Sequence, residues 1–267
     1  MLLREVEYAK PTSVAEALTA LAAHDGARAL AGGQTLINVM KARAASPDVL
    51  VDLNGLDELK GIDLAADGTL TIGAMTTYTE LMASPEAKAR PILGEVAGTI
   101  ADVQVRNRGT IGGNVCASDP TNHLPPLMAA IGARFTVAGA AGEREVTAAD
   151  FFIGVYLTAV GPGELLTKIT IPAGKGDGFA AVTLGHDGTC IANAAASSNG
   201  SLTVALGCVD AVPVVLHPAS ADEQAVRDAV RGAGIDPPSD VHADAAYRAH
   251  LAEVMAVRAA RQAEERA

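Results

Sequence analysis

The chain has 267 residues, 49% of them hydrophobic, so it is long enough to bury one large core or two smaller ones. Its formal net charge of -11 argues against binding to nucleic acid or to an anionic membrane surface, because both require clustered Lys and Arg. No apolar run approaches the roughly 20 residues that span a bilayer, and the N-terminal segment is charged where a signal peptide is apolar, so we expect a cytoplasmic protein without a membrane span.

The first part of the chain alternates helical and extended patterns. An N-cap pair, Thr12-Ser13, precedes apolar residues at helical spacing, which predicts an amphipathic helix. A short apolar run then predicts a strand, and the pair Gly32-Gly33 ends it. The expected elements are a helix at 14–21, a strand at 27–31, a helix at 36–40 and a strand at 49–53.

The next part, up to residue 171, continues this alternation. The expected elements are a strand at 70–73, a helix capped near Thr76-Thr77, helices at 91–101 and 124–131, and strands at 134–137, 144–146 and 165–171. Residues 106–122 are rich in Gly and Asn and have too few periodic apolar positions for a regular element. A long irregular loop inside a compact domain is usually functional, so we expect a functional loop there.

A domain boundary is expected at residues 172–178, where PAGKGDG is rich in turn residues. Beyond it, apolar runs at 190–196 and 202–209 flank Asn199-Gly200, the strongest short signal for a β-hairpin. Two helices are expected to follow, near 222–231 and 243–261. The class is therefore mixed α and β, with two lobes and a small C-terminal domain.

Two glycine clusters carry the strongest functional signal. They are Ala31, Gly32, Gly33, Gln34, Thr35 and Leu36 in the first, and Gly109, Thr110, Ile111, Gly112, Gly113 and Asn114 in the second. Neither fits the dinucleotide motif G-x-G-x-x-G or a P-loop. Adjacent glycines let the main chain approach a ligand and expose successive N–H groups as an anion-binding nest, and the first cluster also precedes a helix N-terminus. Two such clusters would suit a diphosphate; the alternative is a pair of tight turns.

The other reactive residue types form no catalytic or metal-binding pattern. The cysteines, Cys116, Cys190 and Cys208, lie far apart and are expected to be buried thiols. The six histidines never occur at metal-ligand spacing with one another or with cysteine, and no serine stands in a G-x-S-x-G elbow. We therefore expect neither a metal site nor a catalytic acid or base in this chain.

Several motifs resemble one known family. AGGQTLI, followed by MKAR and VLVDLNGL, resembles the first phosphate-binding segment of the FAD subunits of molybdenum hydroxylases, of the carbon monoxide dehydrogenase and xanthine dehydrogenase type. IADVQVRNRGTIGGNVCASDPTNHLPP resembles their second segment, GELLTKITIP their following strand, and AAYRAHLAEVMAVRAA their C-terminal helix. These matches occur in the family's order and span nearly the whole chain.

The resemblance implies an α+β fold. It consists of an FAD-binding domain of the vanillyl-alcohol oxidase (PCMH) type in two α/β subdomains, residues 1–56 and 57–173, and a small C-terminal domain of hairpins and helices, residues 178–267. In that family the two glycine segments hold the FAD diphosphate. The residues implied to line the FAD site are Ala31, Gly32, Gly33, Gln34, Thr35, Leu36, Ala101, Thr110, Ile111, Gly112, Gly113, Asn114, Asp119 and Leu166.

Two stretches depart from the family pattern. His123 stands where many relatives have an acidic residue, so that either an imidazole replaces an acceptor for the FAD sugar or His123 caps the following helix. Residues 179–190 lack the basic side chains and the aromatic that some relatives place near the flavin ring. His186 is the flavin neighbour expected in that stretch; the alternative is a surface turn residue in GHDG.

The resemblance also implies an FAD-binding electron-transfer subunit of an oxidoreductase. Electrons would reach FAD from [2Fe-2S] centres on a small partner subunit and leave to a quinone, oxygen or NAD. A large molybdenum-pterin subunit would oxidise the substrate, commonly in a dimer of heterotrimers. Two alternatives stay open: a self-contained FAD-dependent oxidase or reductase, and a flavin-free scaffold or nucleotide-binding module.

Overall fold

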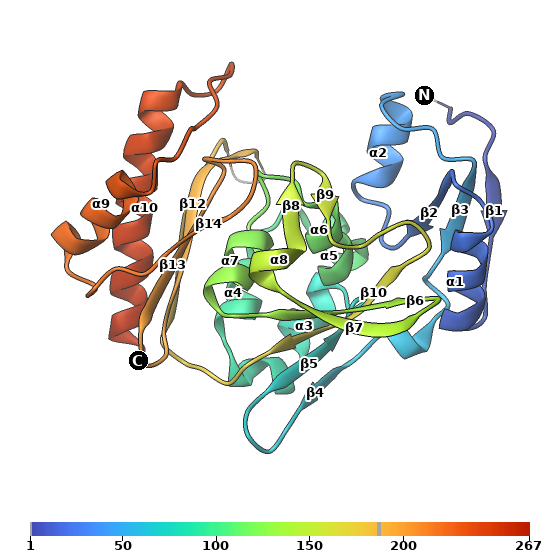
Figure 1. Cartoon of the computed structure of the whole chain (residues 1–267), viewed down its shortest axis with the longest axis horizontal. Helices are drawn as coiled ribbons and strands as arrows, with labels where there is room; N and C mark the ends of the chain where they lie inside the picture. The colour runs from blue at the N-terminus through green and yellow to red at the C-terminus, as the bar shows by residue number, and fades with distance from the viewer. Residues whose placement is uncertain (1, 186–187) are drawn as a thin grey trace.

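Three larger β-sheets follow one another along the long axis of the molecule, each with its own helices (Figure 1). The computed structural model describes residues 2–185 and 188–267. A three-stranded N-terminal sheet lies at one end of the row, a five-stranded sheet in the middle, and a four-stranded C-terminal sheet at the other end (Figure 1). The predicted mixture of α and β structure is confirmed.

The N-terminal sheet is parallel, in the order β1-β3-β2. Its part of the chain contains β1 (Glu7–Ala9), α1 (Val14–Ala22), β2 (Ala27–Leu30), α2 (Leu36–Lys41) and β3 (Val49–Asp52). This order confirms the predicted alternation, with the short, mostly exposed β1 as an addition. Ser13 accepts the Glu16 N–H as the cap of α1, and Ala17 and Leu21 pack with Val51 in a small core.

The middle sheet is antiparallel, in the order β4-β5-β10-β6-β7. Its strands are β4 (Ile62–Leu64), β5 (Leu70–Gly73), β6 (Arg134–Gly139), β7 (Gly142–Thr147) and β10 (Leu165–Ile171). The helices are η1 (Asp57–Leu59), α3 (Tyr78–Ala83), η2 (Glu86–Ala89), α4 (Ile92–Gly98), α5 (Val103–Arg108), α6 (Ile111–Ala117), α7 (Leu124–Ala130) and α8 (Ala148–Phe151), and a hairpin of β8 (Phe152–Gly154) and β9 (Leu157–Thr158) follows α8. Phe135 and Phe151 stack in the central core, with ring centroids 4.0 Å apart.

The prediction of an irregular loop at residues 106–122 is wrong, because this stretch contains the end of α5 and all of α6. Thr110 caps α6 by accepting the Gly113 N–H at 3.0 Å. Ile111 and Val115, four residues apart, form a buried stripe on the helix. The cap and this stripe stabilise a helix that its two glycines disfavour.

The helix expected at 91–101 is shorter than predicted. It ends at Gly98, and Ala101 lies beyond it with a φ of +43°. The Arg106 guanidinium donates to the Ala101 carbonyl at 2.5 Å and to the Ile100 carbonyl at 2.9 Å. Ala101 is therefore in a turn that a side chain of α5 stabilises, and not in the helix where the sequence places it.

The C-terminal sheet is antiparallel, in the order β11-β12-β13-β14. Its part of the chain contains β11 (Asp177–Thr183), β12 (Cys190–Ser198), β13 (Leu202–Gly207), β14 (Val214–Leu216), α9 (Glu223–Gly232) and α10 (Ala245–Glu265). The hairpin expected at Asn199-Gly200 is confirmed, with Gly200 at a φ of +86°. Throughout residues 2–185 and 188–267, no helix is both long enough and apolar enough to cross a membrane.

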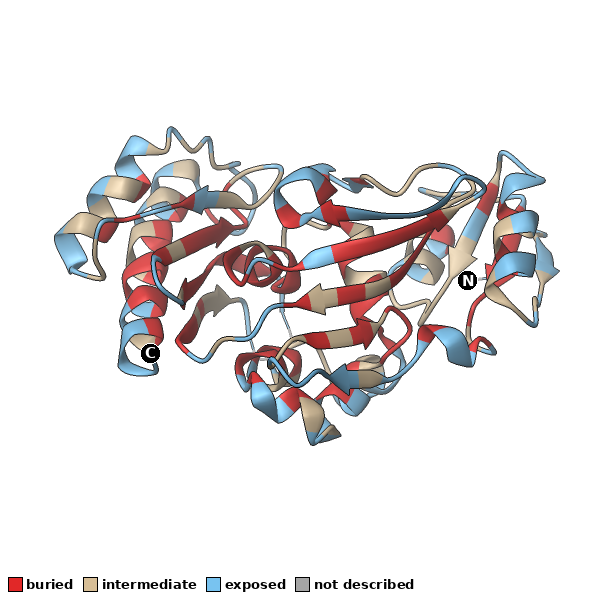
Figure 2. Cartoon of the chain, turned by 60° about the horizontal axis from the view of Figure 1, so that its bottom comes forward, coloured by how far each residue is buried: buried red, intermediate tan, exposed pale blue. Residues whose placement is uncertain are grey.

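Strand β12 is buried along both faces. Ala194 and Ala196 belong to the core beneath α10, whereas Ala195 packs into the core of the middle sheet. Figure 2 shows buried residues along the sheets and on the helix faces that pack on them. Helix α10 packs closely on this sheet: on the neighbouring strand β11, a Cβ on Gly178 would lie 2.0 Å from the Ala259 carbonyl oxygen. The small alanine side chains of β12 thus pack into two cores, one on each face of the strand.

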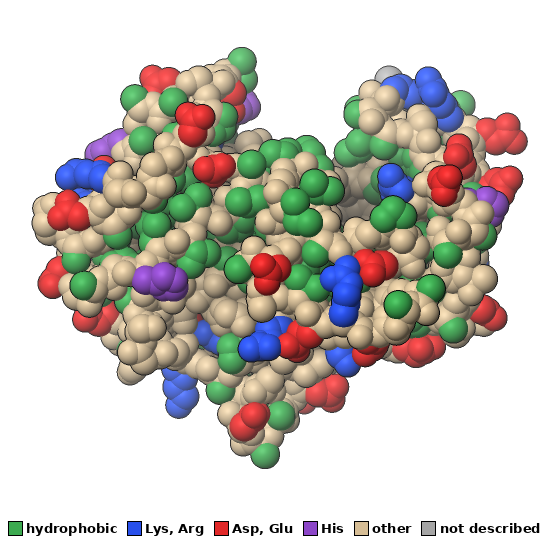
Figure 3. Space-filling model, in the orientation of Figure 1, with side chains coloured by type: hydrophobic (Ala, Val, Ile, Leu, Met, Phe, Trp, Pro, Cys, Tyr) green, Lys and Arg blue, Asp and Glu red, His purple; other side chains and the backbone are tan. Residues whose placement is uncertain are grey.

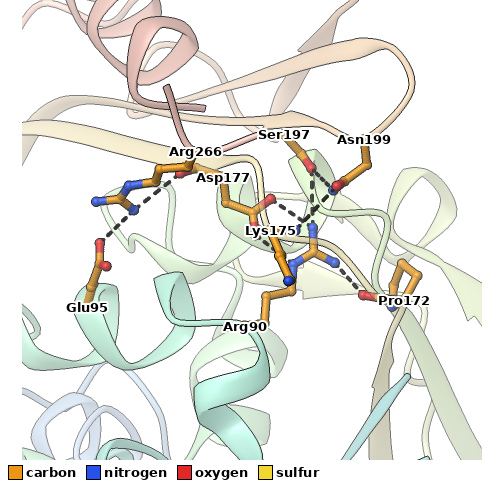
Figure 4. Close-up of polar contacts among 8 residues, drawn as sticks. All are labelled: Arg90, Glu95, Pro172, Lys175, Asp177, Ser197, Asn199 and Arg266. Carbon is orange, nitrogen blue, oxygen red and sulfur yellow. Dashed lines mark hydrogen bonds and ion pairs between the residues drawn. The ribbon is translucent and has the colours of Figure 1, made fainter. Parts of the chain in front are cut away.

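A buried ion pair joins the middle and C-terminal parts (Figure 4). Arg90 Nε lies 2.7 Å from Asp177 Oδ2, and Arg90 Nη2 lies 2.8 Å from Asp177 Oδ1, with both side chains only 2% exposed. Arg90 also donates to the Pro172 carbonyl at 2.5 Å and to Ser197 Oγ at 3.2 Å. Near the C-terminus, Arg266 donates to the Asp177 carbonyl at 3.3 Å. The Arg90 guanidinium thus forms hydrogen bonds with groups from both the middle and the C-terminal parts.

A second ion pair, between Arg248 and Asp240, makes the free energy of unfolding depend on pH. Arg248 is buried in α10 and donates to the Ile191 carbonyl and to Asp240 Oδ2, each at 2.6 Å. Hydrogen bonds from the His242 and Ala243 N–H groups, together with Arg248, lower the pKa of Asp240 to about 2. The unfolded state therefore binds more protons between about pH 2 and pH 4. The stabilisation is complete above about pH 4 and is lost as the pH falls through about 2.

We expect Asp240→Asn to flatten the dependence of the free energy of unfolding on pH in that acid range, measured by urea denaturation. The matched control is Asp236→Asn, an exposed aspartate of the same loop. This control should keep the slope of the parent protein. Equal slopes for the two variants would contradict the assignment to Asp240.

Candidate functional site

The two glycine segments, residues 31–36 and residues 109–114, lie against each other. A Cβ on Gly32 would lie 2.0 Å from the Arg108 carbonyl oxygen, and a Cβ on Gly113 would lie 3.6 Å from the Ala31 Cβ. Only glycine permits the first of these approaches. Figure 3 shows the surface hollowed between the N-terminal and middle parts of the molecule. The fold thus brings together the two segments that the sequence singles out.

The first glycine segment presents main-chain N–H groups that are not bonded. Within the part of the chain that the structure describes, the N–H groups of residues 32–35 have no acceptor. Gly33 turns the chain there with a φ of +73°. The carbonyl side of the segment is anchored, since Asn54 Nδ2 donates to the Ala31 carbonyl at 3.1 Å. A run of such donors in a turn suits an anion, as the sequence predicts.

The prediction of an anion-binding nest of N–H groups at the second glycine segment is wrong. The Ile111 N–H donates to the Thr76 carbonyl at 3.0 Å, and the Gly112 N–H donates to the Ala74 carbonyl at 2.9 Å. The Gly113 N–H is bonded to the cap of α6. A Cβ on Gly112 would lie 2.5 Å from the Ala74 carbonyl oxygen, so glycine there allows α6 to pack closely on the chain after β5.

Asn114 leaves a buried acceptor open at the end of the second segment. Its Oδ1 is buried and has no hydrogen-bond partner in residues 2–185 or 188–267. Burial raises the pKa of Tyr78 to about 12, against a smaller lowering by its hydrogen bond with the Asn114 side chain. A buried carbonyl oxygen without a donor is unfavourable unless a ligand or water supplies one. Asn114 therefore fits the ligand-binding role expected of it.

The loop after α6 is fastened to the β8–β9 hairpin. Ser118 ends α6 with a φ of +44°, and its carbonyl accepts the Tyr156 N–H at 3.0 Å. The Tyr156 hydroxyl donates to Asp119 Oδ2 at 3.1 Å, and Thr121 Oγ1 donates to Asp119 Oδ1 at 2.8 Å. Sequence reasoning missed Tyr156, because 37 residues separate it from Asp119. The only feature of the sequence that singles out Tyr156 is the scarcity of tyrosine, since the chain has four of them.

The same hairpin exposes apolar side chains. Ile153, Val155, Tyr156 and Leu157 are each more than half exposed, at 56%, 51%, 63% and 54%. Figure 3 shows hydrophobic side chains gathered over the middle part, in the region of this hairpin. A group of exposed apolar residues is typical of a surface that contacts another protein. This surface adjoins the loop that carries Asp119.

The remaining predicted residues lie in different settings. His123 is buried, with Nδ1 at 3.2 Å from Asn193 Nδ2 and its ring edge-on to Phe179 at 5.2 Å between centroids. The alternative role is confirmed in position only: His123 is the N-cap residue of α7, but its side chain makes no cap hydrogen bond among the described residues. Leu166 is buried in the central core. His186 lies outside the described residues.

Asp52 and Asn54 support the first glycine segment, and the sequence assigns them no role. Burial would raise the pKa of Asp52, but hydrogen bonds from Tyr8 and Asn54 outweigh it and lower this pKa. Asn54 Nδ2 also lies 2.6 Å from Asp52 Oδ1 while it donates to the Ala31 carbonyl. The end of β3 therefore positions the turn after β2. The motif VLVDLNGL contains both residues, but no local spacing links it to that turn.

Comparison with known proteins matches residues 4–174 to the family described as the FAD binding domain in molybdopterin dehydrogenase. The whole chain is 38% identical to the carbon monoxide dehydrogenase medium chain of Afipia carboxidovorans, of which it covers 99%. It is 31% identical to the 6-hydroxypseudooxynicotine dehydrogenase complex subunit alpha of Paenarthrobacter nicotinovorans, over 98% of this chain and 95% of that one.

Solved structures give the same result for the fold. A chain of reconstituted CO dehydrogenase from Oligotropha carboxidovorans matches with a TM-score of 0.93 and 37% identity, over 100% of both chains. A chain of quinoline 2-oxidoreductase from Pseudomonas putida 86 matches with a TM-score of 0.91 and 32% identity, over 99% of both chains. The similarity therefore includes the C-terminal part, beyond the range of the family match.

Proposed function

This chain belongs to the family of FAD-binding domains in molybdopterin dehydrogenases and is a medium, FAD-binding subunit of the molybdenum hydroxylase type; from that premise we propose that it carries electrons from partner [2Fe-2S] centres through FAD to an external acceptor. The observation that carries the proposal is the contact between the two glycine segments, with the unbonded N–H groups of residues 32–35 beside it. This arrangement suits the diphosphate of a dinucleotide.

The residues present fit FAD. In the proposal, the N–H groups of residues 32–35 bind the diphosphate, and the buried Asn114 Oδ1 accepts a hydrogen bond from the cofactor. The second glycine segment contributes shape, because the N–H groups of residues 111–114 are already bonded. The proposed FAD-binding residues are Ala31, Gly32, Gly33, Gln34, Thr35, Leu36, Ala101, Thr110, Ile111, Gly112, Gly113, Asn114, Asp119, His123, Leu166 and His186.

Bound FAD can take up electrons from a one-electron donor and release them to an acceptor. The chain's own residues act by position. Gly32 permits the contact between the two segments, and Asn54 fixes the main chain of the first one through the Ala31 carbonyl. Tyr156 orients the Asp119 carboxylate at the edge of the site. Such a site needs no side-chain acid or base, since the substrate is oxidised on a partner.

We propose three domains with boundaries at residues 1–56, 57–173 and 178–267. Three hydrophobic cores support this division, one beneath each larger sheet, and the first of them also contains Leu59, Met75 and Leu165 of the second domain. The last two are not independent, because Ala195 of β12 packs into the middle core and Asp177 pairs with Arg90. The C-terminal domain is therefore proposed to hold a constant position against the FAD-binding part.

The proposed partners are a small [2Fe-2S] subunit and a large molybdenum-pterin subunit, assembled as a dimer of heterotrimers in the cytoplasm. The relatives support this, since two are named as a medium chain and as a subunit of a complex. The exposed apolar hairpin from Ile153 to Leu157 offers a surface for such contacts beside the site. The three free cysteines suit a reducing compartment.

The proposal is tested by purifying the chain alone and with the proteins that accompany it in the cell. We expect a yellow chain whose flavin absorbance is bleached only when the partners and their substrate are both present. A lone chain that reduces its flavin with an organic substrate would instead establish a self-contained oxidase or reductase. A folded chain that takes up no FAD would contradict both functions.

A further inference from the structure

Helix α5 connects two points of the proposed FAD site. Ala101 lies just before the helix, and Arg108 is its last residue. The Arg108 carbonyl oxygen is the atom that Gly32 of the first glycine segment approaches. A helix of six residues is only about 9 Å long, so the position of α5 determines where both points lie.

The Arg106 side chain fastens α5 to the chain that precedes it. Its Nη1 donates to the Ala101 carbonyl at 2.5 Å and to the Ile100 carbonyl at 2.9 Å, and the side chain is partly buried. Hydrogen bonds from a charged donor are stronger than those between neutral groups. The two bonds hold the turn at residues 100–101 against the helix that follows it.

The turn that Arg106 holds is unfavourable for its own residues. Ala101 has a φ of +43°, and a left-handed backbone is disfavoured for a residue with a Cβ. Such a conformation persists only where surrounding contacts outweigh its cost. Within residues 2–185 and 188–267 the Ala101 N–H has no acceptor, so the turn retains a main-chain donor.

The other end of α5 is held by α3. Thr79 Oγ1 donates to Asn107 Oδ1 at 2.7 Å, and the Tyr78 N–H donates to the Gly109 carbonyl at 3.2 Å. Glycine is required at 109, because a Cβ there would lie 2.7 Å from Tyr78 Cε2. These contacts position the end of the helix near Gly32, whereas Arg106 links the helix to the turn at Ala101.

We infer that Arg106 is a positioning residue of the proposed FAD site, which holds the Ala101 main chain where its N–H bonds to the cofactor. The inference rests on the proposed function and adds to it a residue that needs no contact with FAD. Arg106 acts through the two carbonyls that it binds. Loss of its donors would let the disfavoured turn relax and would move Ala101 away from the cofactor.

The first test is fluorescence titration of the FAD-free full chain with FAD. Arg106→Met keeps a stem of similar length without a donor, and we expect its dissociation constant for FAD to rise by about tenfold. Arg106→Lys keeps a charged donor and should recover part of this loss. The matched control, Arg134→Met, removes an exposed guanidinium from β6 and should bind FAD as the parent chain does.

Thermal denaturation separates positioning from a general loss of stability. A ligand raises Tm by an amount that increases with its affinity for the folded chain. At one fixed FAD concentration, we expect the rise in Tm to be smaller for Arg106→Met than for the parent chain. A residue that only stabilised the fold would lower Tm equally with and without FAD, and that result would overturn the inference.

Hydrogen exchange of the parent chain is a test that requires no variant. The Ala101 N–H has no acceptor in the described chain, and FAD would supply one. We therefore expect this amide to exchange more slowly once FAD is bound, as followed by nuclear magnetic resonance. An unchanged rate would overturn the inference even if Arg106→Met failed to fold.

Two titration results would also overturn the inference. One is an Arg106→Met chain that binds FAD as tightly as the parent does, and the other is an equal loss of affinity in Arg106→Met and Arg106→Lys. In both cases the parent chain binds FAD, so the proposed function stands. A folded parent chain that takes up no FAD would instead contradict the proposed function, and the role of Arg106 would fall with it.

Discussion

Replacement of Gly33 by Val should lower the affinity of the chain for FAD by about 100-fold. Gly33 has a φ of +73°, and a β-branched residue there would also bring a Cβ within 3.2 Å of Ile37 Cγ1. A left-handed backbone costs such a residue roughly 1–2 kcal/mol, so the turn should relax. The N–H groups of residues 32–35 would then point elsewhere, and each hydrogen bond lost to a charged phosphate is worth about 1.5–3 kcal/mol.

Fluorescence titration of the FAD-free chain with FAD measures this loss. The matched control is Gly234→Val, at a φ of +65° in the loop between α9 and α10, where a Cβ meets nothing within 4 Å. It carries the same backbone strain far along the chain from the glycine segments and should bind FAD as the parent does. A folded Gly33→Val chain with unchanged affinity would disprove the placement of the diphosphate.

Replacement of Arg90 by Met should lower the free energy of unfolding by about 3–5 kcal/mol. The reason is the partner left behind: Asp177 is 2% exposed and would keep a carboxylate in the interior without its bidentate guanidinium. The Pro172 carbonyl would also lose its donor. These groups join the middle and C-terminal parts. Urea denaturation followed by circular dichroism measures the expected loss in the free energy of unfolding.

Two controls separate burial from the mere loss of an ion pair. Arg90→Met combined with Asp177→Leu removes both charges and should regain most of the lost stability. Arg134→Met breaks an exposed pair with Glu145, whose side chains are 57% and 47% exposed, and should cost less than about 1 kcal/mol. If the single and double variants lose equal stability, the unpaired Asp177 carboxylate is not the cause.

Elements with strong local signals are predicted well from the sequence. Ser13 caps α1 as expected, and the Asn199-Gly200 turn joins β12 to β13. In both cases the decisive interaction lies within a few residues, so the local sequence contains it. The α6 helix is missed because two of its seven residues are glycine, and its stabilising contacts come from Thr76 and Ala74 on another segment.

The candidate site shows the same division. The glycine pairs and their neighbours are visible as motifs, and a family resemblance can be based on them. The sequence does not reveal which of their N–H groups stay unbonded, because acceptors such as the Ala74 carbonyl are supplied by packing. The links between Tyr156 and Asp119, and between Asn54 and Ala31, likewise join segments that are remote along the chain.

Local chemistry therefore accounts for the helices and strands with strong periodic patterns, the hairpin turn and the two glycine segments. Long-range packing accounts for the contact of Gly32 with Arg108 and for the buried pair of Arg90 and Asp177. The physical reason is the separation along the chain between the residues that form each contact. Caps and turns are closed by residues three or four positions apart, whereas these contacts form only after whole sheets have packed.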